Sequence, residues 1–236
     1  MGTSCGGVLK LYTLSMKIEE LKKVIEILRE EYPKLKAPIE KLIAHKKGDP
    51  FRALVCTLLS TRTKDETTAE VCQRLFERVK NWEDLLAIDL RELERLLYPV
   101  GFYKNKAKYL KELARQIKEE FGGEVPSDLE ELLRLKGVGR KVANIVLVEA
   151  FGKPAIGVDT HVHRICNRWK LISTKTPEET ERELTKILPQ DYWMDFNKLL
   201  VAFGQTICKP QKPRCDVCPI RDFCGFFKLS PHYPIN

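Results

Sequence analysis

The residues best suited to covalent chemistry are a lysine and an aspartate. Lys141 ends the stretch Leu135-Lys136-Gly137-Val138-Gly139-Arg140-Lys141, and Asp159 stands in Val158-Asp159-Thr160-His161. An amine can attack a sugar carbon, and a carboxylate can accept a proton or stabilise a developing positive charge. Lys141 falls in the first turn of a predicted helix, where the macrodipole and Arg140 both disfavour the ammonium form. The alternative is a solvated lysine and an aspartate that caps the next helix.

The glycines before Lys141 predict a tight turn between two helices. Ser127 and Glu130 have the spacing of a capping box, which predicts that the first helix starts there. Gly137 can adopt the left-handed conformation that ends a helix, and Gly139 can start the next one near 140–151. The backbone N–H groups able to hold a phosphate belong to Gly137, Val138, Gly139 and Arg140. An ordinary helix pair with a tight turn is the interpretation that the glycines alone favour.

Four cysteines near the C-terminus suit one metal centre: Cys208, Cys215, Cys218 and Cys224. Thiolates this close can bind zinc or an iron–sulfur cubane, and the spacing favours the cubane only slightly, since common zinc sites have two separated pairs. Disulfides are the less favoured interpretation, because the other cysteines are scattered singly, as in a reducing cytosol. These others are Cys5, Cys56, Cys72 and Cys166.

These motifs, together with Leu58–Asp65 and Val100–Tyr103, make the chain resemble the endonuclease III family of base-excision DNA glycosylases from about Asp49 to Cys224. The resemblance implies an all-α fold with a helix-hairpin-helix motif and two helical domains that flank a DNA-binding groove. One is a six-helix domain near 43–153, and the other is an iron–sulfur cluster domain formed by 16–42 and 154–236. It implies that Lys141 is the Schiff-base nucleophile, that Asp159 is its catalytic partner, and that the four cysteines hold a [4Fe–4S] cluster without a redox part in bond breaking.

The resemblance also implies a bifunctional glycosylase and lyase acting on oxidised or damaged pyrimidines, or on abasic sites, in double-stranded DNA. The damaged nucleotide would turn out into a pocket, Lys141 would attack C1′, and β-elimination would cut the strand. Adenine glycosylases of this fold carry a glutamate where Thr57 aligns, and typically lack the hairpin lysine. Two alternatives stay open: a monofunctional mismatch glycosylase of the same fold, and a non-enzymatic DNA-binding module with a zinc knot.

Other residues are candidates for DNA contacts. Arg62 stands where bacterial relatives have a gap-filling glutamine, and we expect it to read an orphaned guanine or else to contact a phosphate. Phe102 matches the family's wedge position, with a place in the core as the alternative. His161 is a candidate phosphate contact or, more simply, a structural histidine. The loop between the first two cluster cysteines offers Lys209, Lys212 and Arg214 to phosphates, unless these charges are only solvated.

Composition agrees with a polyanionic partner. The chain has 236 residues, a formal net charge of +8 and a pI near 9.0, which suits nucleic acid. No apolar run approaches membrane-spanning length, and the N-terminus does not resemble a signal peptide. We therefore expect a monomer in the cytoplasm of a prokaryotic cell, associated with the nucleoid and with no membrane partner. The high content of Lys and Glu is typical of a thermophile.

Hydrophobic periodicity predicts helices and no strands. The expected helices are Ile18–Glu31, Phe51–Ser60, Lys64–Lys80, Trp82–Ile88, Leu90–Leu97, Lys104–Phe121 and Asp191–Thr206, with another starting at Thr176-Pro177. Asp65 is expected to cap the helix that follows it. Residues 1–15 precede the first helix and are expected to form a disordered extension.

Overall fold

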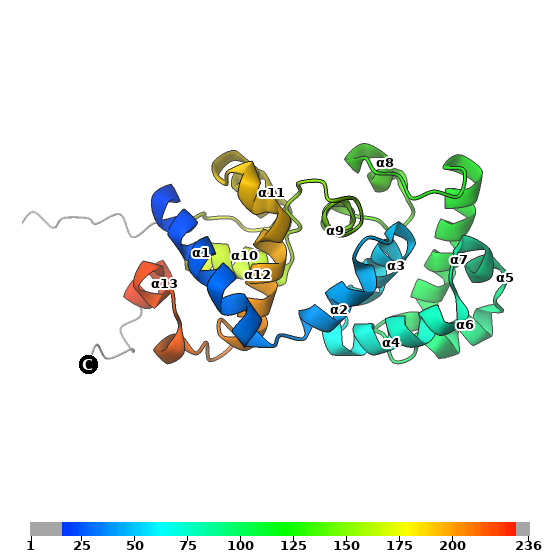
Figure 1. Ribbon diagram of the computed structural model, residues 1–236, viewed down its shortest axis with the longest axis horizontal. Coiled ribbons are helices and arrows are strands. Elements are labelled where there is room, and N and C mark those ends of the chain that lie inside the picture. The colour runs from blue at the N-terminus through cyan, green and yellow to red at the C-terminus, as the bar shows by residue number, and fades with distance from the viewer. Residues whose placement is uncertain (1–15, 230–236) are drawn as a thin grey trace, which may run out of the picture.

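The computed structural model describes residues 16–229, and within that range the chain is helical and contains no strand (Figure 1). The expected extension, 1–15, lies outside the described residues. The α-helices are α1 (Ile18–Leu35), α2 (Ile39–Lys46), α3 (Pro50–Ser60), α4 (Asp65–Arg78), α5 (Trp82–Ala87), α6 (Leu90–Leu97), α7 (Tyr103–Glu120), α8 (Leu129–Arg134), α9 (Arg140–Phe151), α10 (Thr160–Arg168), α11 (Pro177–Ile187), α12 (Trp193–Thr206) and α13 (Gly225–Leu229). Short 3-10 turns occupy Gln190–Tyr192, Cys215–Val217 and Arg221–Phe223. None of the helices between residues 16 and 229 combines the length and apolarity that a bilayer crossing requires.

The buried apolar side chains form two cores. The first gathers residues of α2 to α9, and the second gathers residues of α1 and α10 to α12. Figure 1 shows the corresponding groups at opposite ends of the molecule, with α2 and α9 of the first group nearest the second. The chain enters the first core after α1 and returns to the second after α9. Val201 and Ala202 of α12 pack into the first core, so α12 joins the two.

Several helices start at side chains that cap them. Asn81 accepts a hydrogen bond from Asp84 N, and Asp89 accepts from the first turn of α6. Thr176 accepts from Glu179 N, with proline as the first residue of α11. Each of these side chains satisfies a backbone N–H group that the helix itself leaves without an acceptor.

Two predicted caps are wrong. Asp128, rather than Ser127, caps α8 through its carboxylate, because it directly precedes the helix and its Oδ1 reaches Glu130 N at 2.9 Å. Asp65 does not cap α4 but lies within its first turn, and its Oδ2 accepts a hydrogen bond of 2.6 Å from Gln205 Nε2. Asp65 therefore connects α4 to α12.

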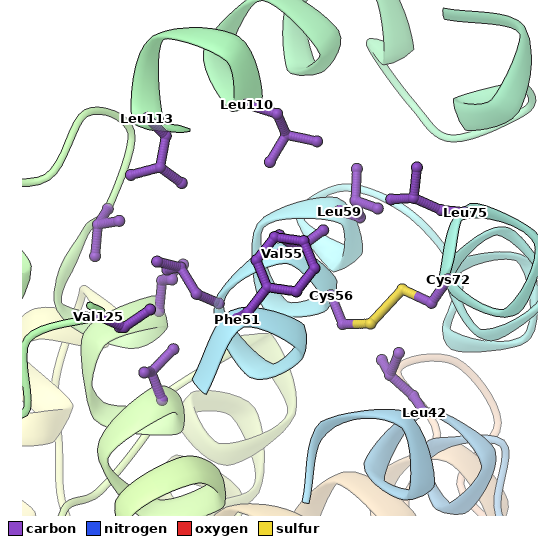
Figure 2. Packing of buried hydrophobic residues seen from close by; sticks show 14 of the residues in the cluster. Leu42, Phe51, Val55, Cys56, Leu59, Cys72, Leu75, Leu110, Leu113 and Val125 are labelled. Carbon is purple, nitrogen blue, oxygen red and sulfur yellow. A yellow bond between two sulfur atoms is a disulfide. The ribbon is translucent and has the colours of Figure 1, made fainter. Parts of the chain in front are cut away.

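A disulfide joins α3 to α4 inside the first core (Figure 2). Cys56 and Cys72 are fully buried, and their Cα atoms are 6.1 Å apart. The interpretation of these cysteines as separate single thiols was wrong, because the packing of the two helices places the two positions face to face. Cys166 remains a free buried thiol, and its burial raises its pKa.

Candidate active site

The hairpin between α8 and α9 has the geometry that its glycines predict. Gly137 has φ +79°, the left-handed region, and Gly139 is the extended residue before α9. Val138 N closes the turn on Leu135 O at 3.1 Å, and the Val138 side chain is buried. The first backbone N–H groups of α9 have no acceptor within the helix, so this end of α9 can hold an anion.

Lys141 and Asp159 line the same cleft, whose volume is about 760 Å³. Lys141 is in the first turn of α9, and Asp159 directly precedes α10. The two residues come from elements that belong to different cores. Arg62 and His161 line the cleft as well. The structure thus brings the predicted amine and carboxylate to one cavity.

Asp159 also caps α10, as the alternative interpretation supposed. Its Oδ1 accepts hydrogen bonds from His161 N at 2.8 Å and from Val162 N at 2.9 Å. Both bonds use the same oxygen, so capping orients the carboxylate and leaves Oδ2 for chemistry.

The segment between α9 and Asp159 is held by two asparagine side chains. Asn144 Nδ2 donates to Ile156 O at 2.9 Å, and Asn197 Nδ2 donates to Gly157 O at 2.6 Å. A Cβ atom on Gly157 would lie 2.6 Å from a side-chain carbon of Ile145. These contacts fix the position of Asp159 relative to the helix that carries Lys141.

The Arg140 side chain binds Glu181 of α11. Its Nε lies 3.0 and 3.1 Å from the two carboxylate oxygens, and its Nη2 lies 2.6 Å from Oε1. Hydrogen bonding to Glu181 is the main cause that raises the pKa of Arg140. Since α11 packs with the second core and α9 with the first, this ion pair bridges the two. Glu181 also offsets the charge that Arg140 presents to Lys141, and nothing in the sequence marked it as a partner.

Two buried lysines add positive charge near Lys141. Lys46 of α2 is 3% exposed, and Lys106 of α7 is 8% exposed. Burial lowers the pKa of each to about 8, and the charge of Lys141 adds to the effect. Sequence reasoning missed both, although each falls on the apolar face of its helix. Lys106 continues the row Leu110, Leu113 and Ile117, which is a detectable signal.

Arg62 and Phe102 lie together at the surface. Both have positive φ, +54° and +59°, and the Arg62 guanidinium carbon is 5.6 Å from the centre of the Phe102 ring. Phe102 is 59% exposed. The alternative placing of Phe102 in the core is therefore wrong, and the two candidates for DNA contact form one exposed pair.

His161 is held from several sides, as expected for a structural histidine. Its Nδ1 lies 3.1 Å from Arg164 Nη2, which also donates to Cys208 O at 2.9 Å. A Cβ atom on Gly204 would collide with Nδ1, so only glycine fits there. Burial lowers the pKa of His161, and the charge of Asp159 partly opposes this. His161 lines the cleft nonetheless.

The four C-terminal cysteines surround one space, which Arg168, Trp169 and Phe203 also line. Burial, with a contribution from the neighbouring sulfurs, raises the pKa of the Cys218 thiol to about 12. Within residues 16–229, no three His, Cys, Asp or Glu side chains converge closely enough for a single ion. Sulfurs that line one space without meeting at one point fit a cubane better than zinc.

The loop after Cys208 is anchored to α10. Arg168 Nη1 lies 3.4 Å from Cys208 Sγ and donates to Lys209 O at 2.7 Å, while Nη2 donates to Pro210 O at 2.7 Å. Metal ligands would fix both ends of this loop as well. The loop exposes the side chains of Lys209, Lys212 and Arg214.

Comparisons with known proteins agree with this fold and site. Residues 55–190 match the model of the HhH-GPD superfamily base excision DNA repair protein, and residues 208–224 match the iron–sulfur binding domain of endonuclease III. Endonuclease III of Thermotoga maritima is 48% identical over 184 residues, which cover 78% of this chain and 86% of that protein. The molecule is thus a helix-hairpin-helix DNA glycosylase of base excision repair. The chain belongs to the endonuclease III family, with DNA glycosylase and AP lyase activity and a [4Fe–4S] cluster as its cofactor.

Solved structures show the same fold. An endonuclease III trapped as a covalent intermediate with DNA is 33% identical and superposes with a TM-score of 0.81, covering 90% of this chain and 98% of that one. A thermostable thymine-DNA glycosylase is 26% identical, with a TM-score of 0.77 and the same coverage. The predicted family, all-α fold and cluster are confirmed, and the zinc-knot alternative is set aside.

Proposed function

We propose that this chain excises oxidised or damaged pyrimidines from double-stranded DNA through an imine between Lys141 and deoxyribose. The observation that carries the proposal is the shared cleft of Lys141 and Asp159 at the end of the hairpin. The cleft is large enough for a flipped nucleotide, whose extrusion costs a few kcal/mol. The protein would act as a monomer, with 43–153 forming one wall of the groove and 16–42 plus 154–236 the other.

The proposed reaction uses the two side chains in turn. The Lys141 amine attacks C1′, and the electron pair of the glycosidic bond leaves with the base. Asp159 Oδ2 stabilises positive charge on the sugar and accepts the proton that the amine loses. Ring opening gives the imine, loss of a C2′ proton follows, and the C3′–O bond breaks as phosphate leaves. The strand is then cut 3′ to the lesion.

The remaining residues are proposed to hold the duplex. The start of α9 would bind a phosphate through backbone N–H groups, and the exposed pair Arg62 and Phe102 would enter the stack beside the lesion. His161 would border the flipped nucleotide. The four cysteines would hold the cluster, which would fix the C-terminal loop. The loop cations Lys209, Lys212 and Arg214 would then face the DNA backbone.

Borohydride trapping tests the nucleophile. Wild-type protein should form a covalent adduct with a duplex that contains thymine glycol, and Lys141→Gln should form none. Lys136→Gln is the matched control, because Lys136 is an exposed lysine of the same hairpin. Asp159→Asn should lower the single-turnover rate by at least about 100-fold. Strand cutting by Lys141→Gln would refute the imine.

A substrate panel tests the specificity. Thymine glycol and hydroxyuracil should be excised in preference to uracil, 8-oxoguanine and thymine mispaired with guanine. Base release from the mispair without any adduct would instead identify a monofunctional mismatch glycosylase. Excision at equal rates opposite adenine and guanine, unchanged in Arg62→Gln, would show that Arg62 does not read the orphaned base.

A further inference from the structure

The two surface loops that carry Arg62 and Phe102 are joined to each other. Thr63 Oγ1 accepts a hydrogen bond of 3.1 Å from Gly101 N. A Cβ atom on Gly101 would lie 2.6 Å from Arg62 O, so the two backbones touch where only glycine fits. The side chains of Arg62 and Phe102 therefore project from one joint, meaning the contact between Arg62-Thr63 and Gly101, rather than from two independent loops.

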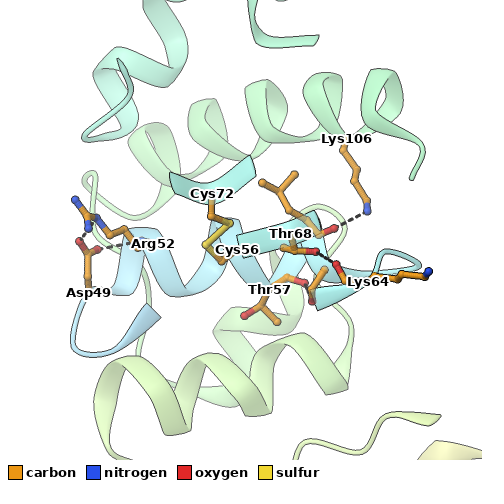
Figure 3. The surroundings of a disulfide bond; sticks show 10 residues. Asp49, Arg52, Cys56, Thr57, Lys64, Thr68, Cys72 and Lys106 are labelled. Carbon is orange, nitrogen blue, oxygen red and sulfur yellow. Dashed lines mark hydrogen bonds and ion pairs between the residues drawn. A yellow bond between two sulfur atoms is a disulfide. The ribbon is translucent and has the colours of Figure 1, made fainter. Parts of the chain in front are cut away.

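Lys106 lies beneath this joint. Its Nζ donates to Leu59 O at 2.8 Å and to Thr61 O at 2.5 Å, and it lies 3.3 Å from Thr63 Oγ1. Figure 3 shows the side chain reaching from α7 to the end of α3. These oxygens belong to the C-terminal end of α3 and the loop after it, where carbonyls lack helical partners and the dipole favours a cation.

The same lysine is tied to the Phe102 loop through its own backbone. Lys106 N donates to Phe102 O at 3.0 Å, which makes Phe102 the residue before the first turn of α7. Arg62 and Phe102 both have left-handed backbones, which non-glycine residues adopt only where the surroundings impose them. The Lys106 ammonium contributes to imposing both. It holds the Arg62 loop through Leu59 O and Thr61 O, and it reaches the Phe102 loop through Thr63 Oγ1, which accepts from Gly101 N.

We propose that Lys106 is a positioning residue that couples Arg62 to Phe102, so that the two side chains enter the duplex as one rigid wedge. The inference rests on the proposed DNA contacts of these two residues. A pocket of about 300 Å³ borders the two loops, and Arg62, Phe102 and Lys106 are among the residues that line it. A neutral residue at 106 would leave the carbonyls of Leu59 and Thr61 without this donor, and the loops would move separately.

Hydrogen exchange in the free protein tests the coupling without DNA. In Lys106→Met, backbone amides in both 61–64 and 98–103 should exchange at least about tenfold faster. Thr63→Val removes only the shared hydroxyl and should affect both loops in the same direction. Lys108→Met, at an exposed position of α7, is the matched control and should change neither. Faster exchange in one loop alone, or in neither, overturns the coupling.

Single-turnover kinetics test its use in the reaction. Lys106→Met should slow excision of thymine glycol by about 100-fold, with binding to undamaged duplex changed by less than about threefold. Lys106→Arg, which keeps the cation, should recover most of the rate. In an Arg62→Ala/Phe102→Ala background, Lys106→Met should cause almost no further loss, since the wedge is already absent. An additive loss overturns the proposal.

Failure of the coupling and failure of the proposed function give different results. If wild-type protein gives no borohydride adduct at a preformed abasic site, the imine mechanism is wrong, while the exchange experiment still decides whether the loops are coupled. If the adduct forms and the loops exchange independently, only the role of Lys106 is wrong.

Discussion

The ion pair between Arg140 and Glu181 should respond unequally to removal of its two members. The exposed fraction of the side chain is 44% for Arg140 and only 7% for Glu181. In Arg140→Met the Glu181 carboxylate keeps its charge in a buried site with no cation against it. In Glu181→Gln the guanidinium still reaches water and can contact the amide oxygen.

The magnitudes follow from this asymmetry. Loss of one partner from a fully buried ion pair lowers the free energy of unfolding by roughly 3–5 kcal/mol. Because Arg140 is partly exposed, we expect a loss of about 2–3 kcal/mol for Arg140→Met. Glu181→Gln should cost no more than about 1 kcal/mol, as expected where water replaces the partner. The double variant should be more stable than Arg140→Met alone, because it leaves no buried charge.

Urea unfolding of the cluster-loaded protein at pH 7 measures these differences. The same variants should lower the single-turnover rate, since the pair holds the helix of Lys141 against α11. Equal small losses in the two single variants, or strict additivity in the double variant, would refute the reasoning.

Three further predictions follow from the buried and exposed charges and the disulfide. The Cys56–Cys72 disulfide closes a sequence separation of 16 and should contribute about 3 kcal/mol to the free energy of unfolding. Mass analysis under non-reducing conditions checks that the bond forms, and urea unfolding with and without reductant measures its contribution. Reductant should not change the stability of Cys56→Ala/Cys72→Ala. Lys46, with a pKa lowered to about 8 from an unfolded value of 10.5, makes the unfolded state bind more protons between these pH values. The free energy of unfolding of the wild type, relative to that of Lys46→Met, should therefore rise by about 3 kcal/mol between pH 8 and pH 10.5. A difference between the two proteins that does not change with pH in urea unfolding would contradict this. The loop cations Lys209, Lys212 and Arg214 can each be replaced with glutamine. The plot of log binding constant for duplex DNA against log salt concentration should then become less steep by about 0.9 for each phosphate that is no longer neutralised. Fluorescence anisotropy measures the binding constants.

The local chemistry of the sequence predicted most of the helices and the hairpin. Gly137 and Gly139 have the conformations that their positions required, and a helix starts at Thr176-Pro177 as predicted. These predictions succeeded because they depend on neighbours within a few residues. The cap at Ser127 failed because Asp128 is equally suited and lies one residue nearer to the helix.

Contacts between distant segments were beyond sequence reasoning. Glu181 became the partner of Arg140 only because α11 packs against the start of α9, and Cys56 met Cys72 only because α3 and α4 cross at these positions. The buried lysine Lys106 is a different case. A charged residue within an apolar helical row is visible in the sequence, and it marks a site where the fold needs a donor.

The second core is assembled from segments that lie far apart in the sequence, with helices α2 to α9 of the first core between them. During synthesis, the apolar face of α1 emerges early, with Leu21, Val24 and Leu28, yet its partners α10 and α12 follow more than a hundred residues later. The nascent protein can form helices α2 to α9 with their hairpin while this face stays uncovered. Enzyme maturation therefore depends on helices that leave the ribosome after the hairpin. A product truncated before them would keep the hairpin turn but lack the side of the cleft that α10 contributes.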